Sequence, residues 1–412
     1  MRDIAILNYS TKALALSVLS VFSTGAVAQT TIAPLVSADD AEYETDPIAV
    51  GPIRISPQIL VQSIFDDNVL ASPDGSEIED VEFIVRPELV ARVGDQTTRF
   101  QLDAYGEFSR FADFTAEDSD TYGVSGLFTL SPNSANRLNI GLGHARLKEN
   151  RGDPEARDLA GPGPRLFDNT YVDANFRRTE GPVLLSLEAT YSDLDAISPI
   201  DDDRDFETYA GSATVGYRIS GPIYLTATGF VNVRDFRLEA TPTDPDRDAT
   251  TYGGQVGVNF SESERLRGRA RVGFFRFDPS DPSLDPRTGF SVNASLVYKM
   301  TPRIAFILDA FNGDVATFRR GAQARTDTNV SLTSQVEMRH NLFARVGVTY
   351  ARNVFVGSGI EEQIFRSQLA VEYLASRRLS LLVEAQGAQR SSDDPTQAYD
   401  QVWVSIGARM RF

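Results

Sequence analysis

Apolar and polar residues alternate along most of the chain from about residue 52 to its end. In FQLDAYGEF (100–108), Phe100, Leu102 and Phe108 fall on one face, and polar residues fill most positions of the other. The stretch VSLTSQVEM (330–338) repeats the arrangement. A period of two is typical of a β-strand with two unlike faces. The pattern therefore predicts an all-β fold.

The apolar runs are separated by two kinds of break, and the two kinds strictly interleave. The short breaks are 93–96, 131–136, 179–182, 220–222, 261–264, 301–303, 340–341 and 375–378. The long polar breaks are 66–79, 112–119, 149–169, 195–205, 239–250, 278–287, 312–326, 355–362 and 391–397. One end of the predicted sheet therefore carries turns, and the other carries loops.

Run length and the sorting of the breaks decide between two all-β architectures. A soluble sandwich has strands of about five or six residues and no reason to sort its turns. A transmembrane barrel needs strands of about 9–11 residues, short periplasmic turns and long outer loops. Eight short and nine long breaks predict an up-and-down antiparallel transmembrane barrel of 18 strands. Sixteen strands remain an alternative if one bent strand has been divided.

The apolar face of such a barrel is expected to point outward. About 18 strands enclose a lumen too wide for side chains to fill, so the apolar positions must meet lipid. Aromatic residues at the ends of runs fit the interfacial girdles of a membrane barrel. These are Tyr122, Phe128, Tyr217, Phe290 and Tyr298.

The N-terminus has the features of a cleaved secretory signal over residues 1–28. Arg2 and Lys12 supply positive charge, 13–22 is a short apolar core, and AVA (26–28) is a small-residue cleavage site. A membrane anchor is the alternative, but the apolar run is short for a bilayer. We expect an acidic, irregular periplasmic leader over 29–51, a barrel over 52–412, and residence in the bacterial outer membrane.

The last strand ends in SIGARMRF (405–412). Ser405, Gly407, Met410 and Phe412 stand at the spacing of the assembly signal of bacterial outer-membrane barrels, which the strand resembles. The resemblance implies recognition by the barrel-assembly machinery through β-augmentation of an edge strand. An ordinary amphipathic strand that ends in Phe is the alternative.

Two further stretches carry a narrower resemblance. ISPQILVQSIFDDNVLAS (55–72) and the aromatic, Asp-rich 105–126 are similar to the β-barrel porin family that accompanies exopolysaccharide-export genes in alphaproteobacteria. The resemblance implies an outer-membrane channel, with polysaccharide as one candidate solute. No catalytic residues come with it.

Candidate catalytic and metal-binding chemistry is sparse. The chain has two histidines, and we expect His340 in a periplasmic turn and His144 at the rim or at a bulge. Asp244, Asp246 and Asp248 begin a calcium-loop spacing, but Ala249 stands where that loop needs Gly and Gln255 where it needs Glu. The sequence therefore predicts no catalytic residues, no resident metal and no cofactor. Contact of the acidic loops with outer-membrane lipid and lipopolysaccharide phosphates is a weaker expectation.

Basic residues stand out in a chain of formal net charge −17. In RLRGRARVGFFRF (265–277), Arg265, Arg267, Arg269 and Arg271 occupy every second position, which is one face of a strand. With Arg218, Arg345 and Arg366 they are predicted to line a net basic lumen, because the acidic residues concentrate in the loops. Such a lumen favours small anionic or polyhydroxylated solutes.

The basic positions leave two questions open. Inward Arg and Glu residues could instead pair across neighbouring strands. A strict register also places Arg276 on the lipid side, so the strand should leave the hydrocarbon or bulge near Phe274–Phe275. A nucleic-acid patch is excluded by the signal peptide and the strand pattern.

Three functions are compatible with the predicted barrel. The leading hypothesis is a passive channel, either porin-like or attached to exopolysaccharide export. The alternative is a non-conducting adhesin or envelope scaffold whose lumen is closed by loop 149–169, which contains RGD (151–153). A rim-active enzyme is least favoured.

Overall fold

The computed structural model describes residues 43, 45–156, 163–237, 246–260, 265–319 and 321–412. The expected signal peptide (1–28), most of the expected leader and Asp244 lie outside these residues. Within them, no helix is long and apolar enough to cross a membrane.

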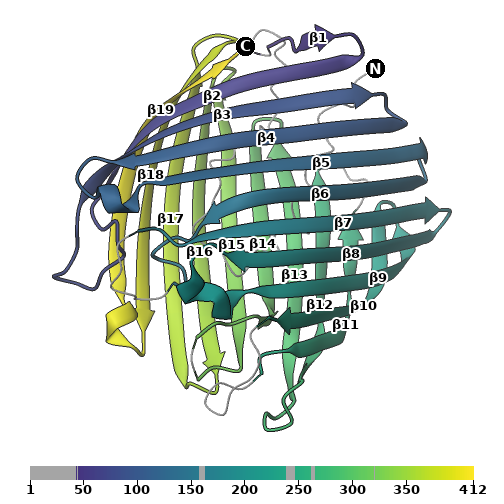
Figure 1. The fold of residues 1–412 in the computed structure, drawn as a ribbon. Coiled ribbons are helices and arrows are strands. Elements are labelled where there is room, and N and C mark those ends of the chain that lie inside the picture. Colours follow the sequence, from purple (N-terminus) through teal and green to yellow (C-terminus); the bar gives the residue numbers. More distant parts are fainter. Residues whose placement is uncertain (1–42, 44, 157–162, 238–245, 261–264, 320) are drawn as a thin grey trace.

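Eighteen strands, β2 to β19, form one closed antiparallel barrel (Figure 1). Each strand pairs with its neighbour in the chain, and β19 closes the wall against β2. The barrel strands are β2 (Ile53–Asp66), β3 (Asp80–Gly94), β4 (Thr98–Phe111), β5 (Ser119–Asn133), β6 (Asn136–Lys148), β7 (Leu166–Glu180), β8 (Val183–Ala196), β9 (Phe206–Ser220), β10 (Ile223–Phe236), β11 (Ala249–Phe260), β12 (Leu266–Pro279), β13 (Arg287–Thr301), β14 (Ile304–Val315), β15 (Ala324–Arg339), β16 (Leu342–Val356), β17 (Ile360–Leu374), β18 (Leu379–Ser392) and β19 (Tyr399–Arg411). The prediction of 18 strands is confirmed, and the alternative of 16 is wrong.

The sorting of turns and loops is also confirmed. Short connections such as Glu180–Val183 and Arg339–Leu342 lie at one end, and the long ones lie at the other. Three of the long connections contain a 3₁₀ turn: η2 (Thr115–Glu117), η3 (Pro199–Arg204) and η4 (Pro395–Gln397). The short-turn end is the periplasmic end of a membrane barrel.

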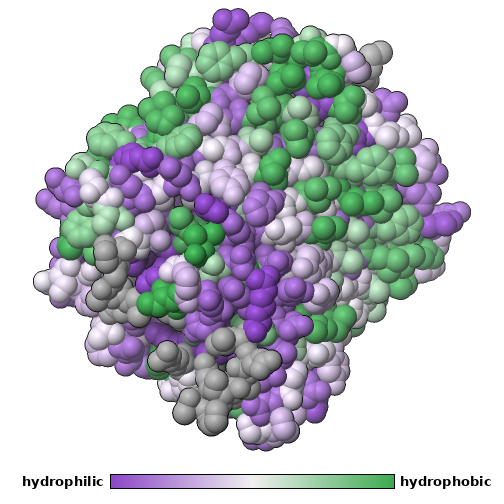
Figure 2. Space-filling model, viewed as in Figure 1, coloured by the Kyte–Doolittle hydropathy of each residue, from purple (hydrophilic) through white to green (hydrophobic). Residues whose placement is uncertain are grey.

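The outer wall is apolar and the inner wall is polar. Side chains such as Val256 (60% exposed), Phe274 (64%) and Ile406 (68%) face outward. Their chain neighbours on the other face, such as Gln255 and Ser405, are buried. Figure 2 shows apolar side chains spread over the outer wall of the strands and polar ones gathered toward the loops. The predicted lipid-facing register is confirmed.

β12 contains no bulge at the place where one was expected. Phe274 and Phe275 keep their register with both β11 and β13, and Arg276 lies opposite Tyr252 and Thr288. Arg276 is exposed on the outer face, directly beyond the edge-to-face pair of Phe274 and Phe290. Because an aromatic pair of this kind marks the membrane interface, the strand leaves the hydrocarbon here and needs no bulge.

His144 likewise lies in regular pairing, opposite Val124 and Thr170. It is a rim residue without a bulge. Its Nδ1 lies 2.9 Å from the Thr170 hydroxyl, and its ring lies 6.0 Å from that of Tyr122.

The last residues before the barrel are more ordered than the sequence predicts. Residues 48–50 form a short strand, β1 (Ile48–Val50), which pairs with the start of β2. The ring of Tyr43 lies 5.8 Å from that of His340, which is in the periplasmic turn predicted for it. Backbone pairing, which an acidic composition does not reveal, is the reason that 48–50 are not irregular.

Replacing Ile406 by Arg should destabilise the barrel by about 2–4 kcal/mol, because a charge would face the hydrocarbon near the middle of β19. The measurement is denaturant unfolding of the barrel in phospholipid vesicles. Ile200→Arg is the control, since Ile200 is similarly exposed (60%) but lies on η3 among the loops. Equal destabilisation by both changes would contradict the assigned lipid face.

Candidate functional site

The arginines of the 265–277 stretch lie on the inner side of the wall. Arg267, Arg269 and Arg271 share the face of β12 that also carries Phe275 and Phe277, which pack inside the barrel against Ala249 and Ala324. Arg265 precedes the strand and is exposed. The structure therefore brings three of the four arginines onto one strand of the inner wall and leaves the fourth at its periplasmic end.

Arg269 reaches a carboxylate that is distant along the sheet. Its Nη1 lies 3.3 Å from Oε1 of Glu188 on β8, although three strands separate β8 from β12. Between them, β9 to β11 turn small side chains such as Ser212, Thr214 and Gly257 to the lumen, so two long side chains can meet above this wall. The meeting narrows the lumen beside β12.

The wall on both sides of β12 is free of acid. On the inner face, neither Ala249–Phe260 nor Arg287–Thr301 places a carboxylate, whereas β13 adds Lys299. Arg271 is only 7% exposed and lies close to Arg269. β11 to β13 therefore form a basic wall, defined by Arg267, Arg269, Arg271 and Lys299.

The other predicted basic residues lie elsewhere. Nε of Arg218 donates a hydrogen bond of 2.9 Å to the Tyr224 hydroxyl, near the periplasmic end. Nη2 of Arg366 donates to the carbonyl oxygen of Gly152 at 3.3 Å, and Arg345 occupies the same inner face of β16 as Phe343. The seven predicted residues therefore do not form one cluster.

Several inner-wall arginines pair across strands, as the alternative interpretation expects. Glu372 on β17 binds Arg409 at 3.1 Å and Arg411 at 3.2 Å, both on β19, and Arg86 on β3 binds Glu107 on β4 at 3.2 Å. Such pairs neutralise the wall around β3, β17 and β19. The basic wall differs from them because its adjoining strands contribute no acid.

The mouth of the barrel is filled from one side by residues 149–156. The carbonyl oxygen of Gly152 accepts hydrogen bonds from Arg366 and from the Tyr399 hydroxyl, at 3.3 and 3.2 Å. The next carbonyl, that of Asp153, accepts from Arg390 at 3.2 Å. A segment that follows β6 is thus anchored on β17, β18 and β19, far around the barrel.

Glu155, in the same segment, makes a buried ion pair in the mouth. Its Oε1 lies 2.7 Å from Nη1 of Arg325 on β15, and both side chains are 1% exposed. Asp327 holds the same guanidinium at 2.6 Å. A buried charge left without its partner is strongly destabilising, so the segment is tied firmly to β15.

A second buried pair fixes the beginning of the segment. Glu149 binds Arg204 of η3 through both carboxylate oxygens, and the Arg204 guanidinium also stacks on the rings of Phe167 and Phe318. Burial raises the pKa of the Glu149 carboxyl, although the hydrogen bonds and charge of Arg204 oppose this shift. The segment is therefore held in the mouth by charge pairs that are shielded from water.

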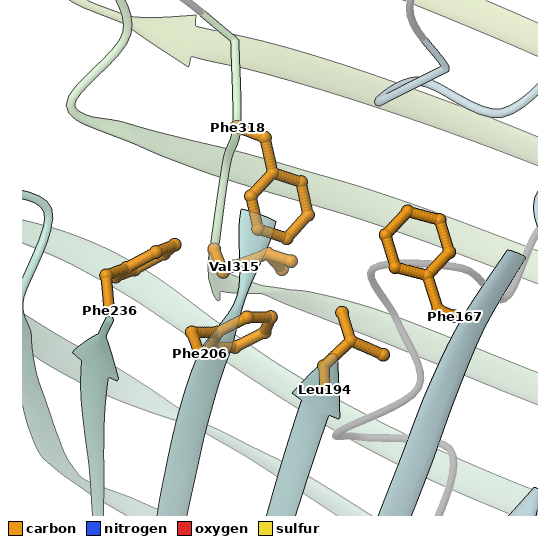
Figure 3. Close-up of a cluster of buried hydrophobic side chains, with 7 residues drawn as sticks. Phe167, Leu194, Phe206, Phe236, Val315 and Phe318 are labelled. Carbon is orange, nitrogen blue, oxygen red and sulfur yellow. The ribbon is translucent and has the colours of Figure 1, made fainter. Parts of the chain in front are cut away.

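The outer end of β14 fills the mouth from the other side. Asp314 lies inside the barrel, where it accepts hydrogen bonds from Arg234 of β10 at 2.7 Å and from Thr251 of β11 at 2.9 Å, and pairs with Arg287 of β13. Val315 and Phe318 pack with Phe167, Leu194, Phe206 and Phe236 in an apolar cluster that Figure 3 shows.

The role of residues 313–319 was not predicted. The sequence places them in a long outer loop, 312–326, where a polar segment is expected. Val315, Ala316 and Phe318 are the signal that was available, because apolar residues in an outer loop need a buried site. The alternation of apolar and polar residues along the chain could not identify their partners, because these come from four other strands.

The RGD tripeptide lies within this filled mouth. Asp153 is 1% exposed, and Arg151 pairs with Glu117 of η2 at 2.5 Å. Because Asp153 is buried and Arg151 is held by Glu117, the tripeptide is not displayed at the surface.

The four residues of the assembly signal divide between the two faces of β19. Ser405 and Gly407 face inward and are buried, and the Ser405 hydroxyl accepts a hydrogen bond of 2.7 Å from Gln62 of β2. Met410 and Phe412 face outward and are 39% and 56% exposed.

Among the described residues, no group of three or more His, Cys, Asp or Glu side chains is arranged to hold a metal ion. Asp248, the third residue of the calcium-like spacing, accepts a hydrogen bond of 2.6 Å from the Phe236 backbone N–H. Its role is to stabilise the start of the β10–β11 connection.

Comparison with known proteins identifies a family. The family described as "Putative beta-barrel porin 2" matches residues 40–412. No curated protein matches the sequence. Among solved structures, OccK2 (OpdF) of Pseudomonas aeruginosa is similar at 14% identity and a TM-score of 0.45, over 87% of this chain and 98% of that chain. Pseudomonas aeruginosa OpdK with vanillate has 11% identity and a TM-score of 0.47, over 87% and 99%.

Glu155→Gln should loosen the filled mouth. The change removes the charge that pairs with Arg325 and weakens the acceptor of the Phe318 N–H, which lies 2.9 Å from Oε2 of Glu155. Loss of charge-assisted bonds of this kind should speed amide exchange at Phe318 by roughly ten- to a hundred-fold. Glu180→Gln is the control, because the Glu180–Arg178 pair is exposed at the periplasmic end. Unchanged protection at Phe318 would show that Glu155 does not hold the mouth.

Proposed function

The chain belongs to this porin family, and from that premise we propose that it is a passive outer-membrane channel for small anionic solutes. A closed barrel with an apolar outer wall and membership of the family place it in the bacterial outer membrane as a porin-like protein. The family points to a channel rather than to an enzyme.

The observation that carries the anion preference is the basic wall of β11 to β13. Three arginines and Lys299 face the lumen there, and neither adjoining strand offers a carboxylate. Glu188 of β8 reaches across the sheet to Arg269, at 3.3 Å. Fixed positive charge along a pore attracts anions and repels cations, and walls of low dielectric strengthen the effect.

Small solutes are favoured over a polymer. Support for a polysaccharide-export role comes from the resemblance at 55–72 and 105–126. This resemblance indicates the family of the chain, but it carries no information about what the lumen accepts. The mouth, in contrast, is filled by 149–156 and 313–319, both tied to the opposite wall. Because these segments occupy the mouth, the proposal is for small solutes and not for a polymer.

A non-conducting barrel is the second candidate, and the filled mouth is the observation that favours it. Arg325, Glu155 and Asp314 are all buried in the space that solutes would cross. An adhesin that uses the RGD tripeptide is disfavoured, because Asp153 is buried. Swelling of proteoliposomes in sugars of graded size separates a channel from a closed scaffold.

We also propose two partners for the chain. The barrel-assembly machinery would recognise β19 through Met410 and Phe412, which are the exposed members of the signal. Lipopolysaccharide would surround the outer rim, where Arg276 and acidic side chains such as Asp193 and Asp120 point outward beyond the apolar belt.

Phe412→Ala should lower the amount of folded barrel in the outer membrane several-fold while leaving the finished barrel nearly as stable. The measurement is the heat-modifiable folded fraction in isolated membranes, compared with refolding in detergent. Val402→Ala is the control, since Val402 is 51% exposed on the same face of β19 but lies outside the signal. Equal loss for both variants would argue against a specific signal.

Neutralising the basic wall should reduce anion selectivity. Arg267→Gln with Arg269→Gln removes two charges that face the lumen. The reversal potential in a salt gradient should therefore shift toward the value of a cation-selective pore. Arg276→Gln is the matched control, because Arg276 lies on the same strand and faces outward. The anion proposal would be overturned if the wild-type channel were cation-selective and the double variant had the same selectivity.

A further inference from the structure

The pairing between β13 and β14 stops before the outer end of β13; we call this strand boundary the β13–β14 seam. β13 pairs with β14 only as far as Val292, which lies opposite Asn312. β13 itself continues outward to Arg287, and residues 287–291 pair only with β12. Beyond Asn312, β14 pairs only with β15, up to Val315 opposite Arg325. The edge of β13 over 287–291 is therefore without a strand partner.

The residues that would continue the seam lie inside the barrel. Asp314 contacts Arg234, Thr251 and Arg287 on the inner wall, and its side chain is fully buried. Ala316, Thr317 and Phe318 follow it and are 4%, 3% and 1% exposed. The bend begins at Gly313, where an added Cβ would meet the tip of the Phe311 ring at 2.9 Å.

The position of the open edge explains how it is tolerated. Unpaired strand edges do not occur in the hydrocarbon, where no water can satisfy the backbone. Here the unpaired edge begins at Ser291, next to Phe290, which pairs with Phe274 in the interfacial girdle, and it continues past the level of Arg276. The Asn312 side chain donates a hydrogen bond of 3.2 Å to the Phe290 carbonyl oxygen, which covers the first exposed group.

We propose that residues 313–317 are a gate with two positions. In the closed position, which this structure holds, they lie in the mouth. In the open position they pair with the free edge of β13 and complete the wall. Asp314 and Phe318 are then withdrawn from the lumen. Continuing the register of Val292 and Asn312 puts Ser291 opposite Gly313 and Thr288 opposite Ala316. This inference rests on the proposed channel function, for which it supplies the route through the filled mouth.

The two positions exchange one set of contacts for another. Closing satisfies Asp314 with two guanidinium groups and a hydroxyl, and Glu155 with the Phe318 N–H. Opening satisfies the β13 edge with the backbone hydrogen bonds of a β-ladder. Asp314 loses its contacts with Arg234, Thr251 and Arg287 in the open position.

Disulfide trapping tests the gate, because the chain contains no cysteine of its own. Thr288→Cys with Ala316→Cys should cross-link only in the open position, since Thr288 is exposed on the outer face and Ala316 is now buried inside. Thr251→Cys with Asp314→Cys should trap the closed position, where the two side chains touch. Val292→Cys with Asn312→Cys is the control, because this pair is zipped in both positions.

The expected results are specific for each pair. Oxidation of the 288/316 pair should raise the single-channel conductance, and oxidation of the 251/314 pair should lower it. The control pair should cross-link without changing the conductance. A reductant should reverse each change. Asp314→Asn should speed cross-linking of the 288/316 pair by roughly tenfold or more, because charge-assisted bonds hold the closed position.

Cross-linking is measured by mass and needs no conduction, so the gate and the channel can fail separately. A folded 288/316 variant that never cross-links, or that cross-links without any change in a conducting channel, would overturn the gate. If the 288/316 variant cross-links faster with Asp314→Asn but the barrel never conducts, the movement is supported and the channel function is overturned.

Discussion

The fold depends on the requirement that every backbone N–H and C=O group inside a lipid bilayer has a partner within the protein. A sheet can meet it only by closing on itself, and β19 does so by pairing with β2. Closure around 18 strands leaves a lumen too wide to be packed, so the two faces of each strand meet two solvents. The alternation of side chains, the lengths of the strands and the sorting of turns from loops all follow from this constraint.

The same constraint makes the exceptions informative. The β13 edge over 287–291 is open from the level of the aromatic pair of Phe274 and Phe290 outward, where water can reach the backbone. Arg276 is carried outward in regular register for the same reason, since its charge lies past the hydrocarbon. Departures from full pairing and from an apolar outer face are therefore confined to the interface.

The charges of the inner wall serve two different purposes. Arg325 with Glu155, Arg204 with Glu149, and Arg234 with Asp314 are buried pairs that hold segments in the mouth, where removing one partner would leave an unmatched charge. The arginines of β12 have acid-free neighbouring strands and face the lumen. The first group holds segments in the mouth, and the second carries the anion preference proposed above.

The sequence by itself determined the barrel, its 18 strands, the face that meets lipid and the shared face of the β12 arginines, because each of these depends on local alternation. Only the tertiary structure decided what fills the mouth. Glu155 meets Arg325, and Val315 meets Phe206, through contacts between segments far apart in the chain, and no local pattern encodes such pairings. For the same reason the β1 strand, the long reach from Arg269 to Glu188 and the unzipped β13–β14 seam could be found only in the folded molecule.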